Sequence, residues 1–208
     1  TEVLLTAYIE WQEACTAYLN GIFAFSVWCE EEKSLFLCRD RMGVKPLFYT
    51  ERDGEILFAS EIKSLLAHPT IKPIVDRQGL ACLLSIGPSR VLGKTVYKDI
   101  VELKPAHYLK ITPNDKRLVR YWDVRDQAHT DDEQETIENV RLLLKAAIER
   151  QLVSDVPLCT FLSGGLDSSY ITAIAANVYR ASGKTLHTYS VDFEESELFF
   201  TKNDFQVS

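Results

Sequence analysis

Residues 156–169 read VPLCTFLSGGLDSS, and this stretch decides the fold of the C-terminal part of the chain. Its first seven residues are mostly apolar and predict one short buried strand, which two glycines then end. An amphipathic pattern over residues 168–181 predicts a helix that is closed by Gly183, and residues 186–191 predict a second strand. The order strand, helix, strand predicts a βαβ unit with parallel strands.

The turn at residues 163–169 has the composition of a phosphate site. Two successive glycines let the backbone approach a ligand, and the start of the helix adds unpaired N–H donors and the positive end of its dipole. The serine hydroxyls can donate to the same oxygens, while Asp167 can cap the helix or help to hold Mg²⁺. The alternative interpretation is an ordinary strand-to-helix turn with a serine and aspartate cap.

The composition excludes several classes of protein. The chain has 208 residues, of which 46% are hydrophobic and 25% charged, as in a folded globular protein rather than a disordered or fibrous one. Its net charge of −7 disfavours nucleic acid and anionic membranes as partners. The five cysteines include no C-x-x-C pair, which favours reduced thiols and a cytoplasmic location. No apolar run approaches the roughly 20 residues that a membrane-spanning helix needs.

Residues 1–125 have the pattern of a layered α/β domain. A helix is predicted over residues 2–18, where apolar side chains recur at helical spacing until Asn20-Gly21. Residues 22–29 have no polar face, so the strand predicted there is expected to be covered on both sides. The remaining predicted elements are strands at 34–38, 47–50 and 56–60, helices at 61–67 and 77–86, and a hairpin of strands at 108–111 and 118–122.

Residues 123–132 are polar throughout and form the best candidate for a linker. This places a first domain at residues 1–125 and a second at 126–208. Thr130 and Glu133 have the spacing of a capping box, and an apolar stripe continues to about Leu152. A helix with one buried face is therefore predicted at the start of the second domain.

The glycine turn resembles the pyrophosphate loop, SGGxDS, of ATP pyrophosphatases, which cleave ATP between the α and β phosphates and adenylate a substrate. It lacks the lysine of a Walker A loop, which fits AMP transfer better than γ-phosphoryl transfer. Residues 87–95, GPSRVLGKT, look similar to a Walker A loop but have five residues instead of four between the glycines. A strand-like run follows them where a helix should begin, so a loop is predicted.

Two stretches of the first domain, residues 39–47 (RDRMGVKPL) and 58–63 (FASEIK), resemble the distal part of class-II glutamine amidotransferase domains. Together with the pyrophosphate loop, they resemble the family of glutamine-hydrolysing asparagine synthetases. Residues 20–25, 102–109 and 121–122 extend this resemblance over nearly the whole chain. It implies an N-terminal-hydrolase-like layered sheet followed by a parallel-sheet pyrophosphatase domain, each present in part.

By this resemblance, the intact enzyme hydrolyses glutamine, adenylates aspartate with ATP and Mg²⁺, and lets ammonia displace AMP to give asparagine. Glutamine, aspartate and ATP are the expected substrates, and members of the family often form dimers. The resemblance implies nucleotide contacts at Leu162, Ser163, Gly164, Gly165, Asp167, Ser168, Ser169 and Val191. Asp167 is also the expected Mg²⁺ ligand, and Val191 could equally be part of a core.

No catalytic residue is expected within the chain. The resemblance places the glutaminase cysteine before Thr1, so the chain is expected to be a fragment that is cut at both ends and inactive by itself. An alternative makes Thr1 an N-terminal nucleophile, but such a nucleophile begins a strand, whereas Thr1 precedes a predicted helix. Cys15 and Cys29 are not expected to be nucleophiles.

Several other interpretations stay open. A related amidotransferase-ligase, similar to β-lactam synthetases or to peptide-modifying enzymes, would share these motifs and differ in its carboxylate pocket. A non-catalytic nucleotide-binding remnant is the non-enzymatic alternative. Arg39, Asp40, Arg41 and Lys45 form a charged cluster in which pairing of Arg39 with Asp40 across a tight turn is at least as reasonable as a catalytic role.

Overall fold

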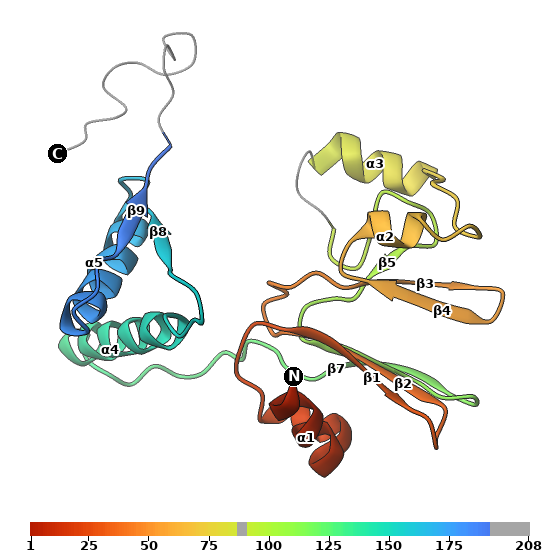
Figure 1. Cartoon of the computed structure of the whole chain (residues 1–208), viewed down its shortest axis with the longest axis horizontal. Coiled ribbons are helices and arrows are strands. Elements are labelled where there is room, and N and C mark those ends of the chain that lie inside the picture. The colour runs from red at the N-terminus through yellow and green to blue at the C-terminus, as the bar shows by residue number, and fades with distance from the viewer. Residues whose placement is uncertain (87–90, 192–208) are drawn as a thin grey trace, which may run out of the picture. The chain divides into compact units, whose positions relative to one another are not determined.

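The computed structural model describes residues 1–86 and 91–191, shown as coloured ribbon in Figure 1. The chain divides into two compact units, Thr1–Asp126 and Gln127–Ser208. The first is built on two antiparallel sheets and the second contains a parallel pair of strands, so the expected mixed α/β class is confirmed.

The first unit contains a four-stranded and a three-stranded sheet. The larger has the order β1-β2-β6-β7 and the smaller the order β4-β3-β5, all antiparallel. The strands of the larger sheet are β1 (Ala24–Cys29), β2 (Ser34–Arg39), β6 (His107–Ile111) and β7 (Lys116–Arg120). Those of the smaller sheet are β3 (Phe48–Arg52), β4 (Glu55–Ala59) and β5 (Val101–Glu102). Strand β5, of two residues, is the one that the sequence pattern did not predict.

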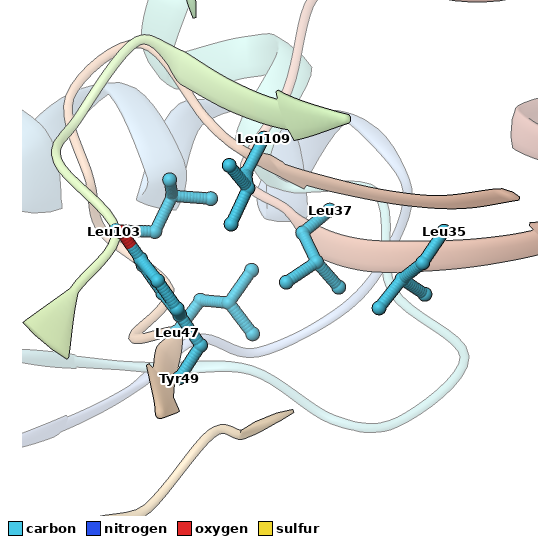
Figure 2. Packing of buried hydrophobic residues seen from close by; sticks show 6 residues of the cluster. All are labelled: Leu35, Leu37, Leu47, Tyr49, Leu103 and Leu109. Atoms are coloured by element: carbon cyan, nitrogen blue, oxygen red, sulfur yellow. The ribbon is translucent and has the colours of Figure 1, made fainter. Parts of the chain in front are cut away.

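The main core lies between the two sheets. Leu37 of β2 and Leu109 of β6 pack with Leu47, Tyr49 and Leu103 from the second sheet and its neighbouring turns. Figure 2 shows the leucine side chains of this cluster turned toward one another. These side chains are almost fully buried, and burial of each contributes about 1.5–3 kcal/mol relative to an exposed position.

Helices cover the outer faces of both sheets. Tyr8 of helix α1 (Glu2–Trp11) and Cys15 of the 3-10 helix η1 (Gln12–Ala17) pack on Phe36 of β2. Leu65 of α2 (Ile62–Leu66) packs on Phe48 of β3. Helix α3 spans Arg77–Ile86. The layered arrangement that the sequence predicted is therefore a helix, two sheets and another helix.

Two predictions about this unit are wrong in detail. The strand covered on both sides is β2, all six residues of which are buried, and not β1. Strand β1 is an edge strand with Trp28 55% exposed, whereas β2 is hydrogen-bonded on both sides and packed on both faces. The helix predicted over residues 2–18 is interrupted at Gln12, whose φ of 49° is incompatible with a continuous right-handed helix.

The second unit contains the predicted βαβ order. Strand β8 (Cys159–Phe161) pairs in parallel with β9 (His187–Tyr189), and helix α5 (Leu166–Ala181) connects them. Both strands are shorter than the stretches that predicted them. Helix α5 is held on β8 by a hydrogen bond from Thr172 Oγ1 to Thr160 Oγ1 at 3.0 Å.

Helix α4 (Glu133–Gln151) precedes this βαβ order, and its capping box is two residues later than predicted. The side chain of Asp132 accepts from the Glu135 amide at 2.8 Å, and the Glu135 carboxylate accepts from the Asp132 amide. The capping box is therefore formed by Asp132 and Glu135 and not by Thr130 and Glu133. An aspartate followed three residues later by a glutamate can form the same two reciprocal hydrogen bonds. The predicted stripe is not buried within the described residues, and Ile137 is 54% exposed.

No helix in the described part of the chain combines the length and the apolar composition needed to cross a membrane.

Candidate functional site

The predicted site residues follow β8 and β9 and lie at the carboxyl-terminal end of this parallel pair, its carboxyl edge. Phe161 lies opposite Tyr189 in the register, so the segments that follow the two strands begin side by side. The amide of Leu162 donates to the Tyr189 carbonyl at 2.9 Å, and Ser190 Oγ donates to the Leu162 carbonyl at 2.6 Å. This is the edge at which open α/β sheets bind ligands.

The two glycines have different roles in the turn. Gly164 adopts a φ of +84°, a left-handed conformation that strains any residue with a Cβ. Gly165 is the N-cap of α5, and no side chain caps the helix there. A Cβ at Gly164 would meet no atom within 4 Å, so the glycine is required by backbone conformation and not by crowding.

Serine hydroxyls stabilise the shape of this turn. Ser168 Oγ accepts from the Ser163 amide at 3.3 Å, lies 3.1 Å from Ser163 Oγ, and donates to the Gly165 carbonyl at 3.1 Å. The Ser169 amide donates to the same carbonyl at 3.1 Å, which closes the first turn of the helix. The turn is therefore held by its own side chains, with its residues mostly exposed to solvent.

The start of helix α5 leaves donors for a ligand. The amides of Leu166, Asp167 and Ser168 belong to the first turn, which has no intrahelical acceptors, and the glycine N-cap supplies none. Leu166 is 90% exposed, so this end of the helix is accessible. Free amides at the positive end of a 16-residue helix, next to serine hydroxyls, form a site for phosphate oxygens.

Asp167 lies in the first turn of α5 and is exposed. Its carboxylate forms no hydrogen bond or ion pair with any residue that the structure describes, so it is not used as a helix cap. A carboxylate beside bound phosphates fits the oxygen ligands that Mg²⁺ prefers. Residues 1–86 and 91–191 contain no group of three or more potential metal ligands, so a metal there would depend on phosphate and water oxygens as well.

Val191 follows β9 and is 75% exposed. It is therefore not part of a core within the described residues, and it lies next to Ser190, which contacts the Leu162 carbonyl. The backbone of Leu162 and Val191 thus reaches the same edge as the glycine turn. The structure brings all eight predicted contact residues to this edge, while their contact with a nucleotide stays a prediction.

Two members of the charged cluster, Arg39 and Asp40, are structural, with partners other than those predicted. Arg39 is buried and pairs with Glu102 at 2.9 Å, not with Asp40. It also donates to the carbonyls of Lys45, Gly43 and Leu103 at 2.7, 2.8 and 2.6 Å.

Asp40 shapes the same turn through backbone groups. Its carboxylate accepts from the amides of Met42, Val44 and Lys45 at 3.0–3.1 Å. Asp40 faces three amide donors and so needs no cation, which explains why the predicted Arg39–Asp40 pair does not form.

Two cysteines of the first unit are unsuited to nucleophilic chemistry. Burial raises the pKa of Cys15, and the negative charge of Glu13 adds to this effect. Burial likewise raises the pKa of Cys38. Since the thiolate is the reactive form, these two thiols are inert at neutral pH. Residues 87–90 of the Walker-like stretch lie outside the described residues, and residues 91–95 that follow form a turn.

Two family models match different parts of the chain. A family model described as a glutamine amidotransferase domain matches residues 1–122, and one described as asparagine synthase matches residues 139–206. Asparagine synthetase [glutamine-hydrolyzing] 3 of Bacillus subtilis is 55% identical over 99% of this chain and 34% of its own length.

Two further relatives are more distant. Asparagine synthetase [glutamine-hydrolyzing] 2 of Bacillus subtilis is 34% identical over 98% of this chain and 28% of its own length. Amidase chyE of Penicillium rubens is 33% identical over 88% of this chain and 27% of its own length. The chain therefore spans between about a quarter and a third of the length of these curated relatives.

Proposed function

Because this chain belongs to the glutamine amidotransferase domain family, we propose that it is part of a glutamine-dependent asparagine synthetase. In the proposed reaction, an oxygen of the aspartate side-chain carboxylate attacks the α-phosphorus of ATP and pyrophosphate leaves. Ammonia from glutamine then attacks the acyl carbon, and AMP leaves to give asparagine. The 55% identity to a glutamine-hydrolysing asparagine synthetase supports this choice of substrates.

The observation that carries the proposal is the glycine turn at the joined carboxyl ends of β8 and β9. Its free amides and the Ser169 hydroxyl suit the departing pyrophosphate, on which negative charge builds up as the bond to the α-phosphorus breaks. The turn has no lysine, as expected for a site that binds the leaving group and does not transfer the γ-phosphoryl group. Leu162 and Val191 are assigned to the border of the nucleotide site through their backbone.

Mg²⁺ is the proposed metal, held by Asp167 together with phosphate oxygens. It would neutralise charge on the α and β phosphates. Ser163 and Ser168 hold the shape of the turn through their hydroxyls, and Ser169 donates a hydroxyl hydrogen bond to the phosphates. Gly164, in its left-handed conformation, leaves the turn open to them. Glutamine, aspartate and ATP are the proposed substrates, and a cytoplasmic homodimer without nucleic acid or membrane partners is the proposed state, in keeping with the net charge of −7.

The test is an assay of the whole protein that contains this chain. Pyrophosphate release and asparagine formation are measured with MgATP, aspartate and either glutamine or ammonium. We expect aspartate-dependent pyrophosphate release that Asp167→Asn lowers by at least about tenfold, because a metal clamp contributes several kcal/mol to the transition state. Asp155→Asn is the matched control, since Asp155 is exposed and lies before β8, at the opposite end of that strand.

The outcomes separate the alternatives. Pyrophosphate release that depends on a different carboxylate, with none from aspartate, would favour an amidotransferase-ligase of another specificity, and the amidase among the relatives makes this the second candidate. Asparagine formation from ammonium but not from glutamine would limit the proposal to the synthetase half. Absence of nucleotide turnover with every carboxylate tried would refute it.

A further inference from the structure

An open cleft of about 460 Å³ is lined wholly by residues of the first unit, and its volume is within the range of small-molecule sites. Its lining includes no residue of the glycine turn. Its walls come from the turn after β2, from the segment between β5 and β6, and from the residues that follow β7. Its charged, histidine and aromatic lining residues are Arg41, Lys104, His107, Arg120, Trp122 and Asp123.

Arg41 is the central group of this cleft. It forms no hydrogen bond and no ion pair with any described residue, in contrast to Arg39 two positions earlier. Its guanidinium lies over the ring of Trp122, with Cζ 5.8 Å from the ring centroid, and its Nε is buried without a partner. This cation–π contact restrains the guanidinium, and its terminal nitrogens, which contact no described acceptor, are available for bidentate contact with an oxyanion.

Lys104 supplies a second cation that no described residue neutralises. Its side chain crosses Gly93 closely, since a Cβ at Gly93 would lie 2.7 Å from Lys104 Cε. The methylene stem of Lys104 therefore packs against Gly93, where a side chain would occupy the same space. Because this contact restricts the stem, Lys104 loses less side-chain entropy when it binds a ligand.

The other charges of the cleft compensate one another. Arg120 pairs with Asp123, so neither contributes a free charge. His107 Nδ1 lies 2.7 Å from the Pro105 carbonyl, which assigns the proton to Nδ1 and leaves Nε2 for another partner. Among the residues that the structure describes, Arg41 and Lys104 are therefore the unpaired cations of the cleft, and its wall of Met42, Leu92, Pro105, Ala106 and Val124 carries no charge.

We propose that this cleft binds a small oxyanion, a phosphate or a carboxylate, through Arg41 and Lys104. Trp122, Asp123 and Val124 form one wall, and they begin the segment that leaves the first unit. The proposal does not rest on the synthetase reaction, because no residue of the glycine turn takes part.

The test is calorimetric titration of the 208-residue chain with inorganic phosphate and, separately, with succinate. A Gly164→Val background weakens phosphate binding at the glycine turn, so that the remaining signal reports on the cleft. We expect saturable binding of at least one probe, weakened at least tenfold by Arg41→Gln and partly restored by Arg41→Lys. The indole N–H resonance of Trp122 should move with the same dissociation constant.

Arg125→Gln is the matched control, because Arg125 is exposed, close in sequence and outside the cleft lining. We expect it to change the affinity by less than twofold. Binding of phosphate alone or of succinate alone supports the site and identifies the anion. Equal losses in Arg41→Gln and Arg125→Gln would mean general charge attraction, and that result, like the absence of binding of both probes, overturns the proposal. Circular dichroism of each variant excludes loss of fold as the cause.

Discussion

The hydroxyl of Ser190 donates a 2.6 Å hydrogen bond to the carbonyl of Leu162, and this bond joins the segments that follow two parallel strands. Leu162 leads directly into the glycine turn, so the bond connects β9 to the backbone that would surround a phosphate. It also gives a hydrogen-bond donor to the Leu162 carbonyl, which lies just beyond the last paired residue of β8. The shape of the candidate nucleotide site thus depends on a residue outside the recognised motif.

Ser190→Ala should therefore weaken nucleotide binding more than it weakens folding. Loss of one exposed hydrogen bond costs about 0.5–1.5 kcal/mol, which corresponds to a several-fold loss of affinity if it falls on the turn. Titration of the whole protein with ATP measures the effect. Ser182→Ala is the control, because Ser182 Oγ makes a similar 3.1 Å bond to Val178 at the far end of α5. Equal affinities of the two variants would contradict the prediction.

The buried pair of Arg39 and Glu102 should make the largest contribution among the ion pairs of the first unit. Arg39→Met leaves the Glu102 carboxylate buried without its cation, for which the expected cost is about 3–5 kcal/mol. Lys63→Met removes the exposed pair with Glu61 and should change stability by less than about 1 kcal/mol. Urea denaturation measures both, and similar midpoints would argue against the structural role.

Gly79→Ala should destabilise the first unit although alanine favours helices. A Cβ at Gly79 would lie 2.0 Å from the Val96 carbonyl oxygen, so the backbone of α3 or of residue 96 must move. Overpacking costs about 1–3 kcal/mol, which exceeds the propensity gain of about 1 kcal/mol. Gly21→Ala, where a Cβ meets nothing within 4 Å, should leave the melting temperature nearly unchanged. A higher melting temperature for Gly79→Ala would contradict this packing.

Asp132→Ala should shorten helix α4, whereas Thr130→Ala should not. The Asp132 side chain accepts from the Glu135 amide, and loss of an N-cap costs about 1 kcal/mol. Hydrogen exchange at the Glu135 amide measures the effect directly, since this amide loses its acceptor. Faster exchange of this amide in Thr130→Ala than in Asp132→Ala would contradict the Asp132 cap and support the Thr130 cap predicted from the sequence.

The first unit should lose stability in alkali between about pH 10 and pH 12. Burial, followed by the negative charges of Glu13 and Glu32, raises the pKa of Tyr8 from 10.0 to about 12. In this range the unfolded state releases the phenol proton while the folded state retains it, so stability present below pH 10 is lost as the pH rises. Urea midpoints measured against pH should fall less steeply for Tyr8→Phe, and parallel curves would exclude Tyr8 as a cause.

Local sequence signals predicted most of the elements. Alternation and turn residues predicted β3, β4 and the β6–β7 hairpin, and the glycine turn predicted the βαβ unit, because these features depend on neighbours in the chain. The failures involve distant partners. Strand β5 has two residues and exists only through its pairing with β3, and the break at Gln12 follows from packing of η1 against β2.

The chemistry of the glycine turn was determined by the sequence itself, since two glycines, three hydroxyls and a carboxylate lie within seven consecutive residues. Only the tertiary structure decided which charges of residues 39–45 are free. Arg39 is neutralised by Glu102, 63 residues away, and Arg41 lies over the Trp122 ring with no hydrogen-bonded partner among the described residues. A charge is paired or free according to what the fold brings within about 4 Å, and residues far apart in the chain provide those neighbours.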